Sequence, residues 1–225
     1  MNQGTVSEPS SPDSVAETPL LVSSEPAKDE LESLFLQLGL HKLGGTSRSL
    51  VVCGVSSASG TTSVVRGLAW TADSVHHLST VVVTVTRQTE NSTTSVGSPG
   101  VCQLLDGRAT INDVAQQTAL AHLHEIPLGG AALPLAGTDL PGLLRALEAE
   151  YRLVLLDAAP VLRQRMTALL SAAAHGALLV VRHRADSRRQ LARAAALIEG
   201  SGGTVQGAVL NRIKESLPSW IVQNR

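Results

Sequence analysis

The chain has 225 residues and a formal net charge of −1, so no overall positive field favours nucleic acid or anionic lipid. Hydrophobic residues make up 43% and aromatic residues 2%, which favours an aliphatic core such as that of a helix-covered parallel sheet. The two cysteines form neither a disulfide framework nor a metal-binding spacing, and no apolar run reaches the length of a membrane span. We therefore expect a cytoplasmic protein with no transmembrane segment of its own.

Three parts of different composition follow one another. Residues 1–24 are rich in Ser, Pro, Glu and Thr, which is typical of a disordered leader. Residues 25–216 form the predicted folded domain, and residues 217–225 form a short tail. The domain opens with a predicted helix from about 25 to 40. The apolar stripe of this helix consists of Leu31, Leu34, Phe35 and Leu38.

Strand and helix signals alternate along the rest of the domain. Apolar and β-branched runs predict strands at 50–55, 80–85, 123–128, 152–156, 177–182 and 205–211. Helical spacing predicts helices at 61–76, 101–105, 111–117, 138–150, 164–174 and 187–199. This alternation predicts an α/β fold, a mostly parallel twisted sheet with helices on both faces. Ligands of such sheets bind beyond the carboxyl ends of the strands.

The segment from Ser56 to Thr62 (SSASGTT) joins the first of these strands to a helix. This layout is typical of a phosphate-binding loop, because helix N-terminal amides and the helix dipole favour an anion. A P-loop ends in Gly-Lys-Ser/Thr, and its lysine reaches the β- and γ-phosphates. Here Gly60 is followed by Thr61 and Thr62, so that charge is missing. The loop is thus a working nucleotide site, a relic of one, or an ordinary tight turn kept for packing.

The order of motifs from about residue 22 to 222 resembles the kinase module of bacterial tyrosine kinases (BY-kinases). These proteins serve capsule and exopolysaccharide synthesis and are relatives of the MinD/ParA-type P-loop ATPases. The segments that carry the resemblance are RSLVVCGVSSASGTTSVVRGLA, STVVVTVTR, PGVCQLLDGRATINDV, HLHEIPLGG, EYRLVLLDAAPVL and VQGAVLNRI. They stand where the family has its P-loop, second Walker strand, G-L-x-D-x-L-x-G segment, P-x-G strand, Walker B strand and last strand. The resemblance implies a P-loop NTPase fold of the MinD/ParA type.

The chain departs from the family pattern at the positions that carry chemistry. Aligned on Gly-Leu-Ala, the loop lysine falls on Thr61 and the first glycine of Gly-Glu-Gly-Lys falls on Ala58. The two acids of the second Walker motif fall on Thr84 and Thr86, and the acid that usually follows the Walker B strand is missing. The family's C-terminal tyrosine cluster is absent, since Tyr151 is the chain's one tyrosine.

The first predicted helix also departs from the family. Phe35 and Leu38 stand where the family's E-x-x-R-x-x-R oligomerisation signature, aligned on Glu32, has arginines. We interpret these two side chains either as apolar surface for a partner or as residues that pack on this chain's own sheet.

The family's residue types survive at Gly60, Thr62, Asp157 and Asn211. The resemblance implies a degenerate site for weak binding of ATP or ADP with magnesium, and it assigns no catalytic residue. The candidate nucleotide-binding residues are Ser57, Ala58, Ser59, Gly60, Thr61, Thr62, Ser63 and Asn211. Asp157 is the Walker B-like residue, and Thr62 and Asp157 are the ligands if magnesium binds. The alternatives are a strand-end carboxylate at Asp157 that caps nearby amides and a turn-forming asparagine at Asn211.

Other patterns favour less specific interpretations. The basic run from Arg182 to Arg193 is interpreted as a solvated helix face rather than a nucleic-acid footprint. The histidine pairs at 76–77 and at 122 and 124 lack a convergent metal-binding pattern. A serine hydrolase is not supported either, because the chain has no G-x-S-x-G elbow.

The leading functional hypothesis is a catalytically impaired BY-kinase-like protein that acts as a regulatory or assembly partner in exopolysaccharide synthesis or export. Its expected partner is a membrane polysaccharide co-polymerase or an active BY-kinase, through which it would be peripheral at the inner membrane, as part of a homo- or hetero-oligomer. One alternative is a divergent ATPase or tyrosine kinase that uses Thr62 and Asp157. Another is a MinD/ParA-like positioning factor, although the end SLPSWIVQNR is not an amphipathic membrane-targeting helix.

Overall fold

The computed structural model describes residues 25–85, 98–130 and 138–212; the predicted leader, Thr86 and the predicted tail lie outside these ranges. The strands are β1 (Arg48–Gly54), β2 (Thr80–Thr84), β3 (Gln116–Gln117), β4 (Leu123–Ile126), β5 (Leu153–Ala158), β6 (Ala177–Arg182) and β7 (Val205–Asn211). The helices are α1 (Glu25–Gln37), the 3-10 helix η1 (Leu40–Lys42), α2 (Thr61–Ser74), α3 (Val101–Leu105), α4 (Ile111–Val114), α5 (Leu140–Glu150), α6 (Arg165–Ala173) and α7 (Arg188–Gly200).

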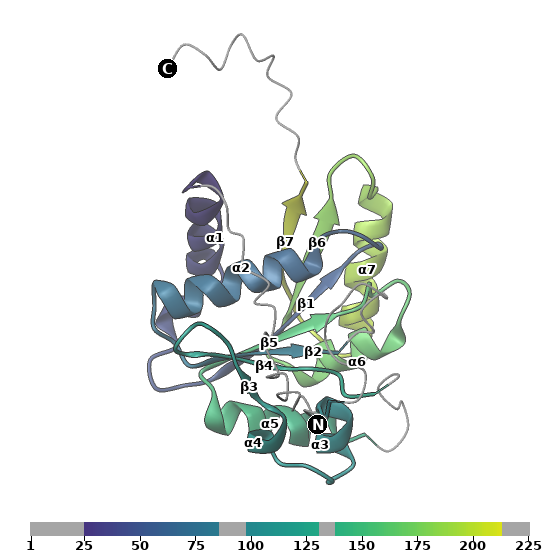
Figure 1. Cartoon of the computed structure of the whole chain (residues 1–225). Coiled ribbons are helices and arrows are strands. Elements are labelled where there is room, and N and C mark those ends of the chain that lie inside the picture. The colour runs from purple at the N-terminus through teal and green to yellow at the C-terminus, as the bar shows by residue number, and fades with distance from the viewer. Residues whose placement is uncertain (1–24, 86–97, 131–137, 213–225) are drawn as a thin grey trace, which may run out of the picture.

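One twisted sheet runs through the centre of the molecule in the strand order β3-β4-β2-β5-β1-β6-β7 (Figure 1). All neighbouring strands are parallel except β3 and β4, which are antiparallel. The β1 strand lies between β5 and β6, so the loop that follows it emerges from the middle of the sheet. The predicted α/β fold with a mostly parallel sheet is confirmed.

Two separate cores cover the two faces of the sheet. Successive side chains of a strand point to opposite faces, so Val51 and Cys53 of β1 join the core under α5, α6 and α7. Leu50 and Val52 join the other core, which α1 and α2 cover (Figure 1). Burial raises the pKa of the Cys53 thiol to about 12, so this cysteine is an inert core residue.

One predicted helix is too long. The pattern predicts a helix over 111–117, but α4 ends at Val114, and the next residue, Ala115, has an extended backbone. Gln116 and Gln117 then pair with Glu125 and His124 of β4 as the antiparallel edge strand β3. Two polar residues without apolar alternation carry no strand signal, so tertiary pairing decides their conformation.

Phe35 lies inside the protein rather than on a partner-binding surface. Its side chain is fully buried and stacks on the ring of His76, with 4.6 Å between ring centroids. Leu38 is half-buried against the same core. The interpretation of Phe35 as apolar surface for a partner is therefore wrong, because the helix places it against α2 and the sheet. Leu36, in contrast, is 43% exposed on α1.

Candidate functional site

The candidate site lies at the carboxyl edge of the sheet, on the face that α2 covers. Neighbouring residues in register on parallel strands point to the same face of a sheet. The register places Thr84 of β2 beside Asp157 of β5, and Arg182 of β6 beside Asn211 of β7. The loop from β1 to α2 passes over these strand ends, so residues far apart in sequence meet there.

Two residues with left-handed backbone conformations shape this loop. Ala58 has a φ of 59° and Gly60 has a φ of 85°. A Cβ atom at Gly60 would clash with Nδ2 of Asn211, so both the conformation and the space require glycine there. Ala58 adopts the same backbone region with a side chain, which is unfavourable by about 1–2 kcal/mol.

Thr61 does not replace the missing lysine with another charge. Its Oγ1 atom lies 3.1 Å from Oγ of Ser59, and the two hydroxyls share a hydrogen bond. Ser59 is almost completely buried beneath the loop. The first residue of α2 therefore turns its polar atom back into the loop. Of the two other predicted loop residues, Ser57 is half-buried and Ser63 is exposed in the first turn of α2.

Thr62 and Asp157 meet as the sequence predicts. The Thr62 hydroxyl donates a hydrogen bond of 2.7 Å to Oδ2 of Asp157, which is 3% exposed. Burial raises the pKa of the Asp157 carboxyl to about 6; the Thr62 hydrogen bond and the charge of Arg66 oppose this rise, and the charge of Glu125 adds to it. A hydroxyl and a buried carboxylate are oxygen ligands of the kind that magnesium uses in P-loop sites.

The alternative role for Asp157 is that of a strand-end carboxylate that caps nearby amides. The carboxylate lies within β5, which continues to Ala158, rather than at the end of the strand. Its side chain accepts a hydrogen bond from the hydroxyl of Thr62 in the first turn of α2, which is not a backbone amide. Thr84, at the position of the first missing acid, lies directly beside Asp157, so an acid there would place two carboxylates side by side.

Asn211 supports the loop from the far side. Its Nδ2 donates a hydrogen bond of 2.9 Å to the carbonyl oxygen of Ser59, and its Oδ1 accepts one of 2.8 Å from the backbone N–H of Arg212. The side chain thus joins the end of β7 to the loop. This positioning role adds to the roles expected from the sequence, and the nucleotide contact expected of Asn211 stays a prediction.

The structure adds two residues that sequence patterns do not single out. Asp186, in the turn after β6, accepts hydrogen bonds from the Ser56 hydroxyl and from the backbone N–H of Arg182. Arg212 follows Asn211 in a left-handed conformation, with a φ of 59°. In the sequence, both belong to ordinary polar stretches, and only the strand order brings them to the loop.

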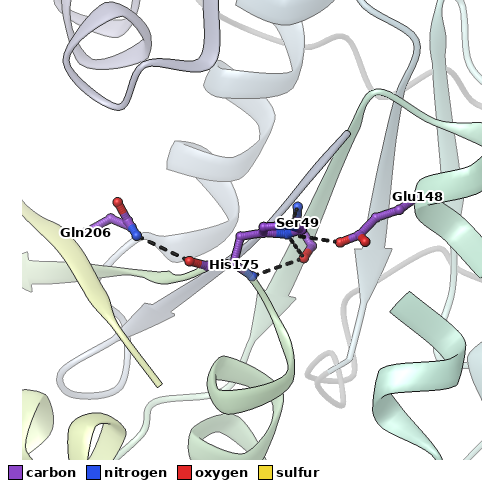
Figure 2. A network of polar contacts seen from close by, with 4 residues as sticks. All are labelled: Ser49, Glu148, His175 and Gln206. Atoms are coloured by element: carbon purple, nitrogen blue, oxygen red, sulfur yellow. Dashed lines mark hydrogen bonds and ion pairs between the residues drawn. The ribbon is translucent and has the colours of Figure 1, made fainter. Parts of the chain in front are cut away.

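A second polar network lies at the opposite edge of the sheet. Figure 2 shows Ser49, near the start of β1, and Glu148 of α5 converging on His175, while Gln206 donates to the His175 carbonyl. Ser49 Oγ and Glu148 Oε1 reach the same ring nitrogen, Nδ1, at 3.0 and 3.1 Å. A catalytic relay needs the hydroxyl and the acid on different nitrogens of the imidazole. Ser49 is also fully buried, so this network is structural.

The described ranges contain neither a metal-binding cluster nor a membrane-spanning helix. No group of three or more His, Cys, Asp or Glu side chains in them is arranged to hold a metal ion. In residues 25–85, 98–130 and 138–212, none of the helices combines the length and apolar character needed to cross a bilayer.

Comparison with known proteins supports the resemblance read from the motifs. No family model matches the chain. The chain is similar to the curated tyrosine-protein kinase Wzc of Salmonella typhi, with 24% identity over 193 residues. This alignment covers 83% of the chain but 27% of the kinase, so the chain spans about a quarter of the length of this relative.

Solved structures of a tyrosine kinase domain and of MinD share the fold of this chain. The kinase domain of the Escherichia coli tyrosine kinase ETK superposes with a TM-score of 0.77 at 21% identity, covering 90% of this chain and 83% of that domain. The septum site-determining protein MinD of Pyrococcus horikoshii, solved with Mg-ADP, gives a TM-score of 0.54 at 19% identity over 78% of this chain and 76% of MinD. The predicted resemblance is confirmed: the chain is BY-kinase-like, with the fold of MinD-type P-loop ATPases.

Proposed function

We propose that this chain is a catalytically impaired BY-kinase-like protein, a regulatory or assembly partner in capsule or exopolysaccharide synthesis or export. The observation that carries the proposal is the uncharged side chain of the first residue of α2. At the position of the P-loop lysine stands Thr61, whose hydroxyl bonds to Ser59.

The proposed impairment follows from missing charge. Phosphoryl transfer depends mainly on positioning and on neutralising the phosphate charge with lysine and magnesium. Removing one preorganised electrostatic group from an active site typically lowers kcat by about 10²–10³-fold. A second group is missing at the end of β2. The residue there, beside Asp157, is Thr84 and not an acid. These two losses support impaired chemistry more strongly than either would alone.

The remaining residues fit a bound nucleotide. The N-terminal amides of α2 suit phosphate oxygens, and Thr62 and Asp157 suit magnesium. Nε of Arg182 is buried without a hydrogen-bond partner, on the sheet face that the loop covers, and a phosphate oxygen would satisfy such a donor. Bound magnesium-ATP would supply a transferable phosphoryl group. The protein would hold it through these groups and lacks the charges that speed its transfer.

The proposed partner is a membrane polysaccharide co-polymerase or an active BY-kinase. The similarity to about a quarter of a much longer tyrosine kinase supports a role beside such proteins. In this setting the chain would act at the cytoplasmic face of the inner membrane through its partner, in a homo- or hetero-oligomer.

One observation favours a second candidate function, a divergent ATPase or tyrosine kinase of the same pathway. The Thr62–Asp157 hydrogen bond keeps the two predicted magnesium ligands together at 2.7 Å. In this case the missing cation would come from elsewhere in the assembly.

The test is to measure magnesium-ATP binding and turnover for the native chain, Thr61→Lys and the uncharged control Thr61→Gln. The proposal predicts no turnover by the native chain above the background of a boiled sample. It also predicts that lysine, but not glutamine, tightens ATP binding by roughly tenfold or more, as expected for a charge-assisted contact. Turnover by the native chain at micromolar ATP would instead establish the second candidate.

The pathway is tested separately by the genes that surround this one. Glycosyltransferase genes and a chain-length co-polymerase gene beside it would support polysaccharide synthesis. A replication or division operon would favour a MinD/ParA-like positioning factor instead.

A further inference from the structure

Three arginines lie near the phosphate loop, and they differ in what their charge can reach. Arg66 lies about one turn farther along α2 than Thr62, and about 7.5 Å along the helix axis from its first residue, Thr61. Its positive charge partly opposes the rise that burial causes in the pKa of Asp157, so Arg66 acts on the carboxylate side of the site. Arg182 leaves β6 beneath the loop, on the same face as Asn211. Arg212 approaches the loop itself.

Arg212 is held against the glycine that precedes the lost lysine position. Its Nε atom lies 3.8 Å from the point that a Cβ of Gly60 would occupy. The guanidinium group therefore lies one residue away from Thr61 along the loop. It belongs to the same chain, so this charge needs no partner protein.

A chain of hydrogen bonds fixes this position. The backbone N–H of Arg212 donates to Oδ1 of Asn211, and Nδ2 of Asn211 donates to the carbonyl of Ser59. Arg212 adopts a left-handed backbone conformation, which is unfavourable for a residue with a side chain. Such strain persists where surrounding contacts impose it, and it often marks functional sites. In this conformation Arg212 donates to Asn211 and its side chain lies beside Gly60.

The charge of Arg212 is available to a ligand. The side chain is solvent-exposed. In the ranges 25–85, 98–130 and 138–212, the ion pairs are those of Arg108 with Asp106 and of His175 with Glu148, so Arg212 has no carboxylate partner there. A guanidinium group presents several N–H donors in a planar fork that matches phosphate geometry, and it keeps its charge at every physiological pH.

We infer that Arg212 supplies, within the same chain, the phosphate-binding charge that Thr61 has removed from the loop. The ligand class is a nucleoside di- or triphosphate, with phosphates bound between the N-terminal amides of α2 and the Arg212 guanidinium. The inference rests on the proposed retention of a nucleotide site and adds the residue that gives it affinity. Arg212 approaches from the β7 side of the loop, so it would anchor phosphate without restoring the lysine's role in transfer.

The test compares the native chain with Arg212→Gln, Arg212→Lys and the control Arg193→Gln, which removes an exposed charge from α7. Isothermal titration calorimetry with ADP, ATP, inorganic pyrophosphate and adenosine gives affinities without requiring activity. Circular dichroism and thermal melting check that each variant is folded. Arg212→Gln is expected to weaken ADP and pyrophosphate binding by about tenfold or more, with a smaller loss for Arg212→Lys. Adenosine affinity should be unchanged, and Arg193→Gln should match the native chain.

The outcomes separate this inference from the proposed function. Equal ADP affinity for the native chain and Arg212→Gln would overturn the role of Arg212 alone. No binding of ADP or pyrophosphate by the native chain at millimolar concentration would also overturn it, while leaving an impaired assembly partner in place. Efficient ATP turnover by the native chain would refute catalytic impairment without affecting the Arg212 inference.

Discussion

Replacing Asp157 with asparagine should stabilise the protein at neutral pH and leave it unchanged in acid. The carboxylate is buried in β5, and burial raises its pKa from an ordinary 3.8 to about 6. At about 1.4 kcal/mol per pH unit, this rise means that the charged form destabilises the folded state by roughly 3 kcal/mol. Asparagine has a similar shape and carries no charge, and its side-chain oxygen accepts the same hydrogen bond from Thr62.

The stability gained by Asp157→Asn should grow as the pH rises. Between about pH 4 and pH 6 the folded protein binds a proton at Asp157 more tightly than the unfolded chain does. The contribution of this group to stability is therefore complete below about pH 4, falls as the pH rises through 6, and is lost above that. Asp157→Asn lacks this loss, so the two proteins should diverge as the pH increases.

Urea unfolding followed by circular dichroism at pH 4.5, 6 and 7.5 measures the difference. At pH 7.5 the variant should be more stable by up to about 3 kcal/mol, or roughly 6–12 °C in Tm for a chain of this size. Asp29→Asn, which removes an exposed carboxylate from α1, is the control and should shift stability by less than about 0.5 kcal/mol. An Asp157→Asn variant that is less stable than the native chain at pH 7.5 would refute the reasoning.

Three further substitutions test the loop and the core. Ala58→Gly should stabilise the protein by about 1 kcal/mol in urea unfolding, because glycine adopts the left-handed backbone conformation of residue 58 without strain. A loss of stability would contradict the left-handed conformation at this position. Asn211→Ala should cost about 1 kcal/mol, and hydrogen exchange should become faster in the loop around Ser59, which loses its anchor. Phe35→Ala should destabilise by about 3–5 kcal/mol, because the ring is fully buried against His76; a change below 1 kcal/mol would restore a surface role.

The sequence predicts the sheet and the meeting of Thr62 with Asp157 in the candidate site. Uninterrupted aliphatic runs such as that of β5 mark strands covered on both faces, and they fold as expected. Thr62 and Asp157 are also predictable as a pair. Both follow from motifs that place them at the carboxyl edge of the sheet, and the structure joins them by a hydrogen bond.

The approach of Arg212 and Asp186 to the loop depends on information that local patterns do not contain. Arg212 and Asp186 reach the loop because β7 lies beside β6, and β6 beside β1, in one particular register. Nothing in their own segments distinguishes them from solvated polar residues. Phe35 shows the same limit, because helical spacing predicts its stripe but not whether this chain or a partner covers it.

The anchoring of the loop between β1 and α2 has a consequence for the order of folding. Asn211 reaches Ser59 across 152 residues of sequence, and Asp186 reaches Ser56 across 130. Contacts with such large separations form late, since the entropy of closing long segments must first be overcome. During synthesis from the N-terminus, a chain that has emerged only to the end of β6 has the loop but not its support. The loop around Ser59 would therefore reach its final anchored state only when β7 docks.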